Sequence, residues 1–157
     1  MRHVFMVCFF FFFLTLSVSA VAAMDDPPSY SLLVRARSLK CTFSIVMLGD
    51  WKEGKLTTSV DSEEFVLHFD SIDITNKRAR LIGNMGAEDV GLLVTSRSLT
   101  FVEITPGGNP NFTTVYPNYK DGGTGFIAVT SRHIVLPSLK GLHPFPSQHH
   151  GSCVVWQ

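Results

Sequence analysis

The sequence has no excess of charge of either sign. Its 157 residues include 13 Lys and Arg and 13 Asp and Glu, so the formal net charge is zero. Proteins that bind nucleic acid or acidic membranes through charge carry a basic patch or run, and none is present here. We therefore expect no nucleic-acid partner, and membrane contact only through an uncleaved N-terminal segment.

Sustained helical periodicity is also absent. Apolar residues do not keep a 3.6-residue spacing over more than two turns in any window. From Leu39 onward, β-branched and aromatic residues are dense, and turn residues separate short runs of them. This pattern indicates an all-β domain.

The expected strands form a single antiparallel meander of about eight short segments. In the second, Phe65, Leu67 and Phe69 share a face, whereas Ile72 and Ile74 have the opposite parity, which predicts a bulge. A closed barrel hides its edges completely, so it is favoured over a sandwich. The expected segments are 39–48, 64–74, 78–83, 90–95, 99–105, 112–116, 126–135 and 152–156, with a turn at 49–55 and a proline-bearing loop at 136–151.

One long apolar run occurs, at the N-terminus. A short basic start, apolar residues 4–16 and small residues through Ala23 have the layout of a secretory signal peptide, with cleavage after Ala20, Ala22 or Ala23. The alternative is a membrane anchor formed by residues 4–23. We expect a signal peptide at 1–23, a flexible lead-in at 24–37 and a β-barrel-like domain at 38–157, exported to a periplasmic or extracellular location.

Cysteine is scarce. Of the three cysteines, Cys8 lies in the leader and should leave with it, so Cys41 and Cys153 remain. An even pair in an exported chain predicts a disulfide, with free or metal-binding thiols as the alternative. Because the first and last strands of a closed meander are neighbours, this bridge fits the barrel. Its loop closure would stabilise the fold by roughly 4–5 kcal/mol in the chain-entropy model.

A metal site at His149 and His150, in the segment PSQHHGSC, is the less favoured interpretation of that segment. Zinc needs three or four converging ligands, and adjacent residues on a strand point to opposite faces. The segment brings no acidic residue or cysteine pair at ligand spacing. We expect no cofactor and a solvated loop.

Ser131, Arg132 and His133 are candidate functional or sheet-capping residues. Ser131 and His133 share a strand face, but residues two apart on a strand are roughly 7 Å apart, too far for a direct hydrogen bond. The G-x-S-x-G elbow of many hydrolases does not occur. A hydrolase that uses His133 as its base, with Asp70 nearby, is kept as an alternative.

Other polar residues are expected to have structural roles. Asp70 and Asp73 flank the parity switch and are expected to face solvent or satisfy a turn. Glu103, if inward, needs a partner, with Arg80 or Arg97 as candidates. The segment NFT that begins at Asn111 has the pattern of an N-glycosylation acceptor.

Three spaced segments, LTFVEITPGGNPNFTTVY, GFIAVTSRH and PSQHHGSC, resemble segments shared by a group of small exported bacterial proteins of unknown function. The resemblance covers roughly residues 39–156. It implies a bacterial exported domain and no activity or catalytic residue. In that group the two positions before the glycine of the last segment are often aromatic, whereas this chain has His149 and His150.

The leading functional hypothesis is a non-enzymatic binding module for a small apolar ligand, an envelope component or a protein partner. A barrel of about eight strands has room for packed side chains or one small ligand. If the bulky side chains expected to point inward filled the interior completely, recognition on the surface would be favoured over a ligand inside the barrel. Besides the hydrolase, a structural or inhibitory surface protein is an alternative. The inward candidates are Phe43, Phe65, Leu67, Phe69, Phe101, Phe112 and Phe126.

Overall fold

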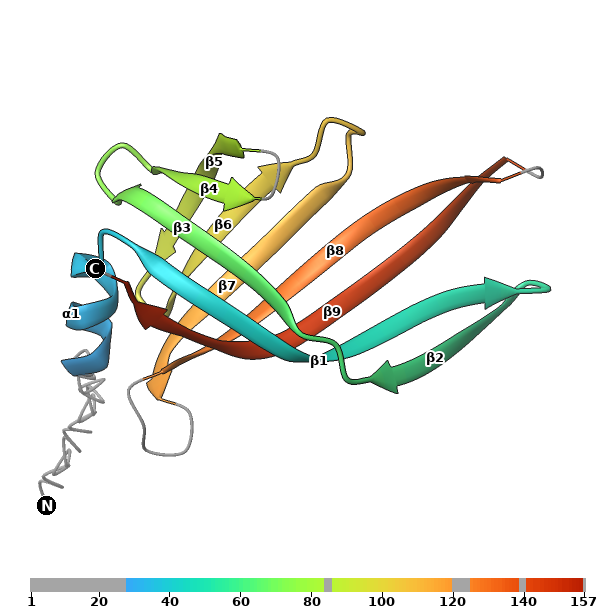
Figure 1. Cartoon of the computed structure of the whole chain (residues 1–157), viewed down its shortest axis with the longest axis horizontal. Helices are drawn as coiled ribbons and strands as arrows, with labels where there is room; N and C mark the ends of the chain where they lie inside the picture. Colours follow the sequence, from blue (N-terminus) through green and yellow to red (C-terminus); the bar gives the residue numbers. More distant parts are fainter. Residues whose placement is uncertain (1–27, 84–85, 120–124, 139–140, 157) are drawn as a thin grey trace, which may run out of the picture.

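The computed structural model describes residues 28–83, 86–119, 125–138 and 141–156, so the expected signal peptide lies outside the described residues. Within these ranges one helix precedes nine strands (Figure 1). The elements are α1 (Pro28–Arg35), β1 (Leu39–Lys52), β2 (Lys55–Asp61), β3 (Phe65–Asp73), β4 (Arg78–Gly83), β5 (Gly86–Thr95), β6 (Ser98–Ile104), β7 (Pro110–Tyr119), β8 (Phe126–Ser138) and β9 (Gly141–Val155).

Eight of the strands close into an antiparallel barrel, which confirms the predicted fold. β1 pairs with β3, each strand from β3 to β9 pairs with the next, and β9 returns to pair with β1. Closure gives every barrel strand two neighbours and so removes the free edges of an open sheet.

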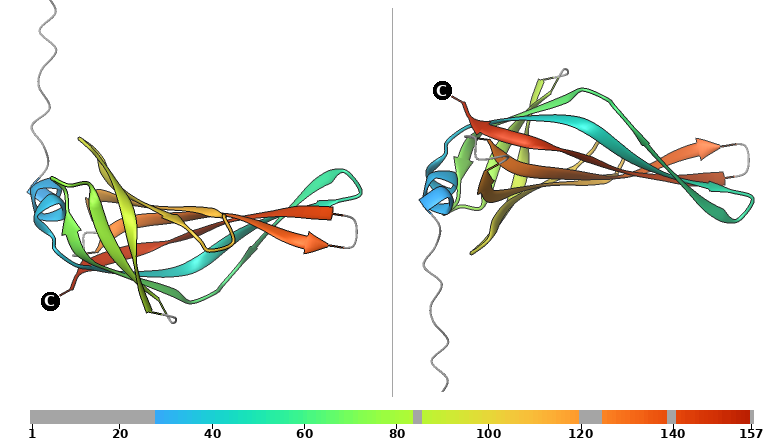
Figure 2. Two further views of the ribbon diagram at one scale, coloured as in Figure 1. Left: turned by 90° about the horizontal axis from the view of Figure 1, so that it is seen from above. Right: turned by 90° about the horizontal axis from the view of Figure 1, so that it is seen from below.

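The ninth strand, β2, belongs to an extension of the barrel that we call the arm, residues 46–61, 133–138 and 141–147. β2 pairs with the second half of β1, from Val46 opposite Asp61 to Lys52 opposite Lys55. The β8–β9 hairpin also continues beyond the barrel, to Ser138 opposite Gly141. Figures 1 and 2 show both hairpins projecting on the side of the barrel away from α1.

The arm was not predicted from the sequence. A turn was expected at 49–55, where β1 instead continues to Lys52, and residues 56–63, which include most of β2, were assigned to no element. The first half of β9 was expected to be a loop, partly because it contains Pro144 and Pro146. Pairing between β9 and β1 ends at Ser147, so both prolines lie where β9 has a partner on one side only. Proline lacks an N–H group and is tolerated in a strand with such a free side.

The predicted bulge in β3 is confirmed. The register between β3 and β4 shifts between Asp70 and Asp73, and Phe69 and Ile72 are both 1 % exposed. Ser71 has a φ of 51°, which allows the extra residue to be accommodated and returns Ile72 to the inner face.

The predicted disulfide between Cys41 and Cys153 is confirmed. The two residues lie directly opposite each other on β1 and β9, and both side chains are fully buried. The bridge therefore spans the seam at which the barrel closes.

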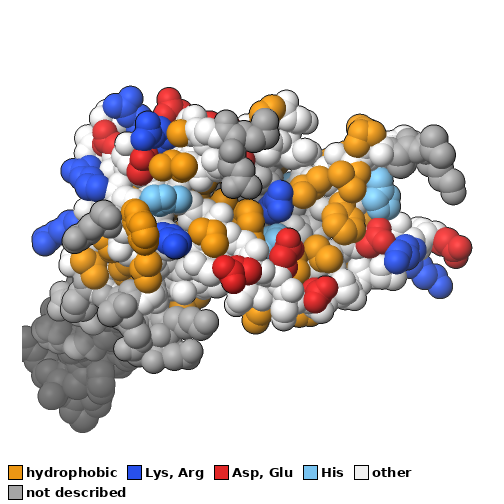
Figure 3. Space-filling view, in the orientation of Figure 1, with side chains coloured by type: hydrophobic (Ala, Val, Ile, Leu, Met, Phe, Trp, Pro, Cys, Tyr) orange, Lys and Arg blue, Asp and Glu red, His pale blue; other side chains and the backbone are white. Residues whose placement is uncertain are grey.

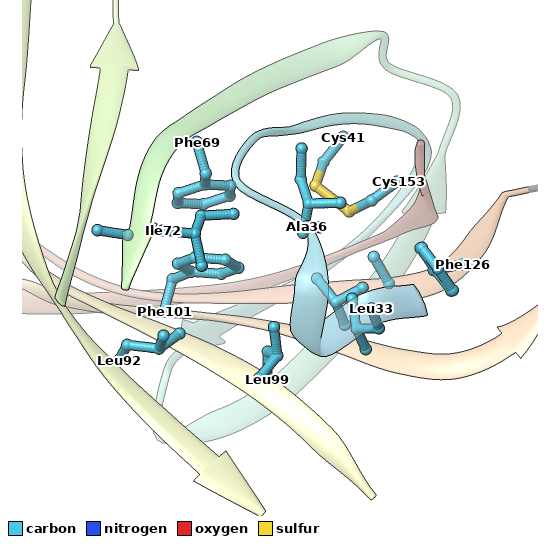
Figure 4. Close-up of a cluster of buried hydrophobic side chains, with 14 of the residues drawn as sticks. Leu33, Ala36, Cys41, Phe69, Ile72, Leu92, Leu99, Phe101, Phe126 and Cys153 are labelled. Carbon is cyan, nitrogen blue, oxygen red and sulfur yellow. A yellow bond between two sulfur atoms is a disulfide. The ribbon is translucent and has the colours of Figure 1, made fainter. Parts of the chain in front are cut away.

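The hydrophobic core fills the half of the barrel that lies next to α1. Figure 4 shows Leu33 and Ala36 entering this core beside Phe126 and the disulfide. The rings of Phe69 and Phe101 stack at a centroid distance of 3.8 Å. Phe112 was expected to face inward, but its neighbour Thr113 takes that position, and the Phe112 ring instead meets His133 edge-on at 5.7 Å.

The helix differs from the flexible lead-in expected at 24–37. Residues from Pro28 to Arg35 form α1, and Leu33 is 0 % exposed in the core. The Ser29 hydroxyl donates to the carbonyl of Pro117 on β7, and the Tyr30 hydroxyl donates to the carbonyl of Thr95 at 2.7 Å. These contacts hold the helix over one end of the barrel.

Candidate ligand site at the barrel mouth

A cavity of about 600 Å³ lies in the half of the barrel that the core does not fill. The helix α1 is bonded to Thr95, at one end of the barrel. The cavity borders the other ends of β4, β5 and β6, so it opens at the end of the barrel far from the helix. Its apolar wall is formed by Phe65, Leu67, Leu81, Ala87 and Pro106, and its polar groups come from Glu88, Glu103, Asn111, Thr130 and Arg132.

One side of this mouth cavity is acidic. Asn111 on β7 donates its side-chain N–H to Glu103 Oε2 on β6 at 2.7 Å. The Glu88 carboxyl on β5 lies within hydrogen-bonding reach of the Glu103 carboxyl. Desolvation by the cavity wall, followed by the neighbouring Glu103 carboxyl, raises the pKa of Glu88. The expected partner of Glu103 was Arg80 or Arg97, whereas the bonded partner is Asn111.

Asn111 has one polar atom left without a partner. Its side chain is 7 % exposed, and no hydrogen bond reaches Oδ1 from the described residues. A buried acceptor without a donor is costly, so this oxygen is a natural contact for a bound molecule. The burial of Asn111 also means that the folded barrel cannot carry a glycan on this side chain.

A basic side chain borders this acidic side, because Arg132 on β8 is the register partner of Asn111 on β7. The guanidinium of Arg132 on β8 lies over the Phe65 ring at 5.4 Å, and no described carboxylate comes within 4.0 Å of it. His149 on β9 is 2 % exposed, packs against Phe65 at a ring distance of 5.1 Å and approaches the Ser147 hydroxyl at 3.3 Å. Burial, followed by the charge of Arg132, lowers the pKa of His149.

The other predicted site residues are divided between the two faces of the sheet. His149 lies opposite Val46, and both side chains are buried on the inner face. His150 lies opposite the exposed Ile45 and belongs to the outer face. In the part of the chain that is described, no three His, Cys, Asp or Glu side chains cluster as a metal site would require.

Ser131 and His133 lie on the outer face, on either side of the inward Arg132. They border a second hollow of about 260 Å³ that also contacts Met47 and Gln148. The Gln148 amide donates to the Ser131 hydroxyl at 3.3 Å. Among the described residues no hydrogen bond joins Ser131 to His133, so the pair required of a serine nucleophile and its base is not assembled here.

Asp70 and Asp73 have structural roles. Arg80 binds Asp70 in a bidentate pair at 2.8 and 2.7 Å, which lowers the pKa of Asp70. Asp73 accepts bonds from the backbone N–H groups of Thr75 and Asn76, and so closes the β3–β4 turn as expected.

The arm extends one wall of the mouth. The inner face of the sheet continues onto it through Leu48 and Phe145, and the two hairpins are joined by His143 and Asp50, whose side chains lie 2.9 Å apart. The hydrogen bond from His143 lowers the pKa of Asp50. Figure 3 shows hydrophobic side chains gathered over this projecting part of the molecule, with charged groups towards its tip.

The outer face of the arm is also apolar. Register places alternate residues of the four strands on this face, and many of them are large and exposed. They are Met47, Trp51, Leu56, Val60, Val135 and Leu142.

Comparisons with protein-family models, with curated proteins and with solved structures find no match. Among the described residues, no helix combines the length and hydrophobicity needed to span a bilayer. The candidate function is therefore argued from the geometry of the mouth cavity.

Two residues of that cavity, Glu88 and Asn111, were not identified as site residues from the sequence. The expected strand began at 90, so it omitted Glu88, although Val90 and Leu92 already had the inward parity that Glu88 shares. Extending the alternation by two residues would have found it.

Proposed function

We propose that this protein is a binding module that holds a small, largely apolar ligand in the mouth of its barrel. The observation that carries the proposal is the mouth cavity itself. Its volume of about 600 Å³ is in the range of small-molecule sites, which combine an apolar lining with a few polar groups that orient the ligand.

The two halves of the barrel support this proposal. The half next to α1 is packed with side chains and sealed by the helix, which gives a rigid base. The other half has apolar walls but is not filled. A barrel of about eight strands that is partly filled has room for one small ligand.

Binding of the uncharged fluorophore N-phenyl-1-naphthylamine to the full chain tests the proposal. We expect saturable binding of one molecule per chain, with a rise in fluorescence as the probe leaves water. Leu67→Trp replaces an aliphatic side chain of the cavity wall with a bulkier indole ring, and should reduce the affinity for the fluorophore at least about tenfold.

Val66→Trp is the matched control, because Val66 is the neighbour of Leu67 on the exposed outer face of β3. It should leave the affinity unchanged. Equal affinities of the two variants, or no saturable binding by the parent chain, would show that the cavity is not a ligand site.

The proposal includes an exported location, periplasmic or extracellular. The leader at residues 1–23 and the disulfide between Cys41 and Cys153 support it, because such bridges persist in oxidising compartments. Recovery of the chain only from the cytoplasm, with an intact mass that still includes the leader, would contradict this part.

A further inference from the structure

The acidic side of the mouth cavity presents three groups that accept hydrogen bonds and that the described residues satisfy only in part. They are the carboxyl groups of Glu88 and Glu103 and the Oδ1 atom of Asn111. Neither carboxyl forms an ion pair with a described residue. The Asn111 side-chain N–H donates one hydrogen bond to this group, at Glu103 Oε2.

The positive charge of Arg132 does not satisfy these acceptors. Arg132 is on β8, and β7 lies between it and Glu103 on β6. Its guanidinium is already placed over the Phe65 ring, where it gains a cation–π contact. The acidic group therefore keeps its repulsion between like charges, next to an apolar wall that weakens solvation.

We infer that the ligand of the mouth cavity carries a primary ammonium group, which binds Glu88, Glu103 and Asn111, with its apolar chain against Phe65, Leu67 and Leu81. An ammonium group has three N–H donors and no acceptor, so it can donate to both carboxyl groups and to the Asn111 Oδ1 atom. This inference rests on the proposed binding function and adds the chemical class of the ligand.

The pH dependence follows from the raised pKa of Glu88. Below that pKa the Glu88 carboxyl holds a proton and attracts a cation less strongly. An ammonium group favours the ionised carboxyl, so binding releases this proton. Affinity for an alkylammonium should thus increase as pH rises through the raised pKa of Glu88, and fall only when the amine itself deprotonates near about pH 10.

Displacement of N-phenyl-1-naphthylamine from the full chain by three ligands of one chain length tests the inference. Decylammonium, decanol and decanoate are each used below the concentration at which they form micelles. We expect decylammonium to bind about tenfold or more tightly than decanol, because its hydrogen bonds are charge-assisted, and decanoate to bind most weakly.

The variant Glu88→Gln/Glu103→Gln should retain the probe but lose the preference for decylammonium and its pH dependence. The control Glu53→Gln/Glu64→Gln removes two negative charges from exposed positions that do not line the cavity, and should keep the preference. If the first double variant does not fold, Glu88→Gln alone, which leaves the bond between Asn111 and Glu103 in place, should reduce the preference.

The outcomes separate this inference from the proposed function. Equal affinity for the three ligands would overturn the ammonium group while leaving the binding function in place. Preferred binding of decanoate would assign the head group to Arg132 instead. A third outcome would assign the acidic group to a metal ion. In that case calorimetry would detect binding of CaCl2 to the parent chain but not to Glu88→Gln/Glu103→Gln, and decylammonium would not be preferred. Absence of saturable probe binding would overturn the binding function itself.

Discussion

At the scale of single residues, the crossing of β1 and β9 leaves no space for a side chain at Gly151. A Cβ atom added there would lie 2.0 Å from the Thr42 carbonyl oxygen and 2.6 Å from the Phe43 Cα atom. The register shift between Phe43 and Ile45 brings the two backbones together at this point. The glycine thus permits the close approach of two strands beside the disulfide.

Gly151→Ala should lower the free energy of unfolding by about 3 kcal/mol or more, because backbone atoms cannot move aside as a side chain can. Urea unfolding followed by circular dichroism measures the change. The matched control is Gly91→Ala on β5, where the nearest atom to the new Cβ is Val102 Cβ at 3.7 Å, an ordinary contact. A similar stability for the two variants would contradict the predicted clash.

Alternation along a strand assigns neighbouring residues to different surroundings. Arg132 enters the mouth cavity while Ser131 and His133 lie outside it, and His149 is buried inside while His150 belongs to the outer face. The sequence could predict this separation because the side-chain period of a strand is two residues. Which of the two faces would enclose a cavity was not visible in the alternation.

At the scale of the elements, α1 closes the end of the barrel that lies opposite the mouth. Leu33 inserts into the core between Leu99 and Phe126, as Figure 4 shows, while Leu32 on the neighbouring position faces solvent. A flexible lead-in was expected at 24–37, because the eight residues of α1 are too few for a clear helical period. Packing against the barrel, not intrinsic propensity, stabilises so short a helix.

Leu33→Ala should lower the free energy of unfolding by about 2–5 kcal/mol, since it removes a fully buried side chain and leaves a cavity. Leu32→Ala is the control, because Leu32 is 47 % exposed on the same helix, and should change stability by less than about 0.5 kcal/mol. Thermal unfolding of both variants measures the difference. Equal losses would mean that the helix does not seal the barrel through Leu33.

At the scale of the whole molecule, the disulfide and the pairing of β1 with β9 close the barrel together. Cys41 and Cys153 are separated by 112 positions in the chain, so the bridge restricts the unfolded chain strongly. The same closure divides the interior, with the core next to α1 and the cavity at the mouth. Rigid walls around that cavity depend on the closure.

Cys41→Ser/Cys153→Ser should lower the free energy of unfolding by up to roughly 4–5 kcal/mol in non-reducing buffer. The parent chain treated with reductant should unfold at nearly the denaturant concentration of the variant. An intact mass two hydrogens below that of the reduced parent would verify the bridge. If parent and variant unfold together without reductant, the bridge does not stabilise the barrel.

Much of the fold could be predicted, but less of the candidate site. The strand at 78–83, the bulge before Ile72 and the disulfide followed from local parity, turn residues and the number of cysteines. The arm did not, because the prolines of β9 are compatible with a strand only where one side is unpaired, and pairing partners are not a local property. Of the acidic group at the mouth, only Glu103 was singled out.

Three features of this protein follow from its amino-acid sequence alone: the all-β class, the alternation of inward and outward residues, and the pair of cysteines available for a bridge. These features depend on local periodicity and on residue counts. The meeting of Glu88, Glu103 and Asn111, from three consecutive strands, at one side of a cavity, with the Arg132 guanidinium turned to Phe65, is visible only in the folded chain. Their meeting depends on strand register and barrel closure, which bulges and long-range pairing set together.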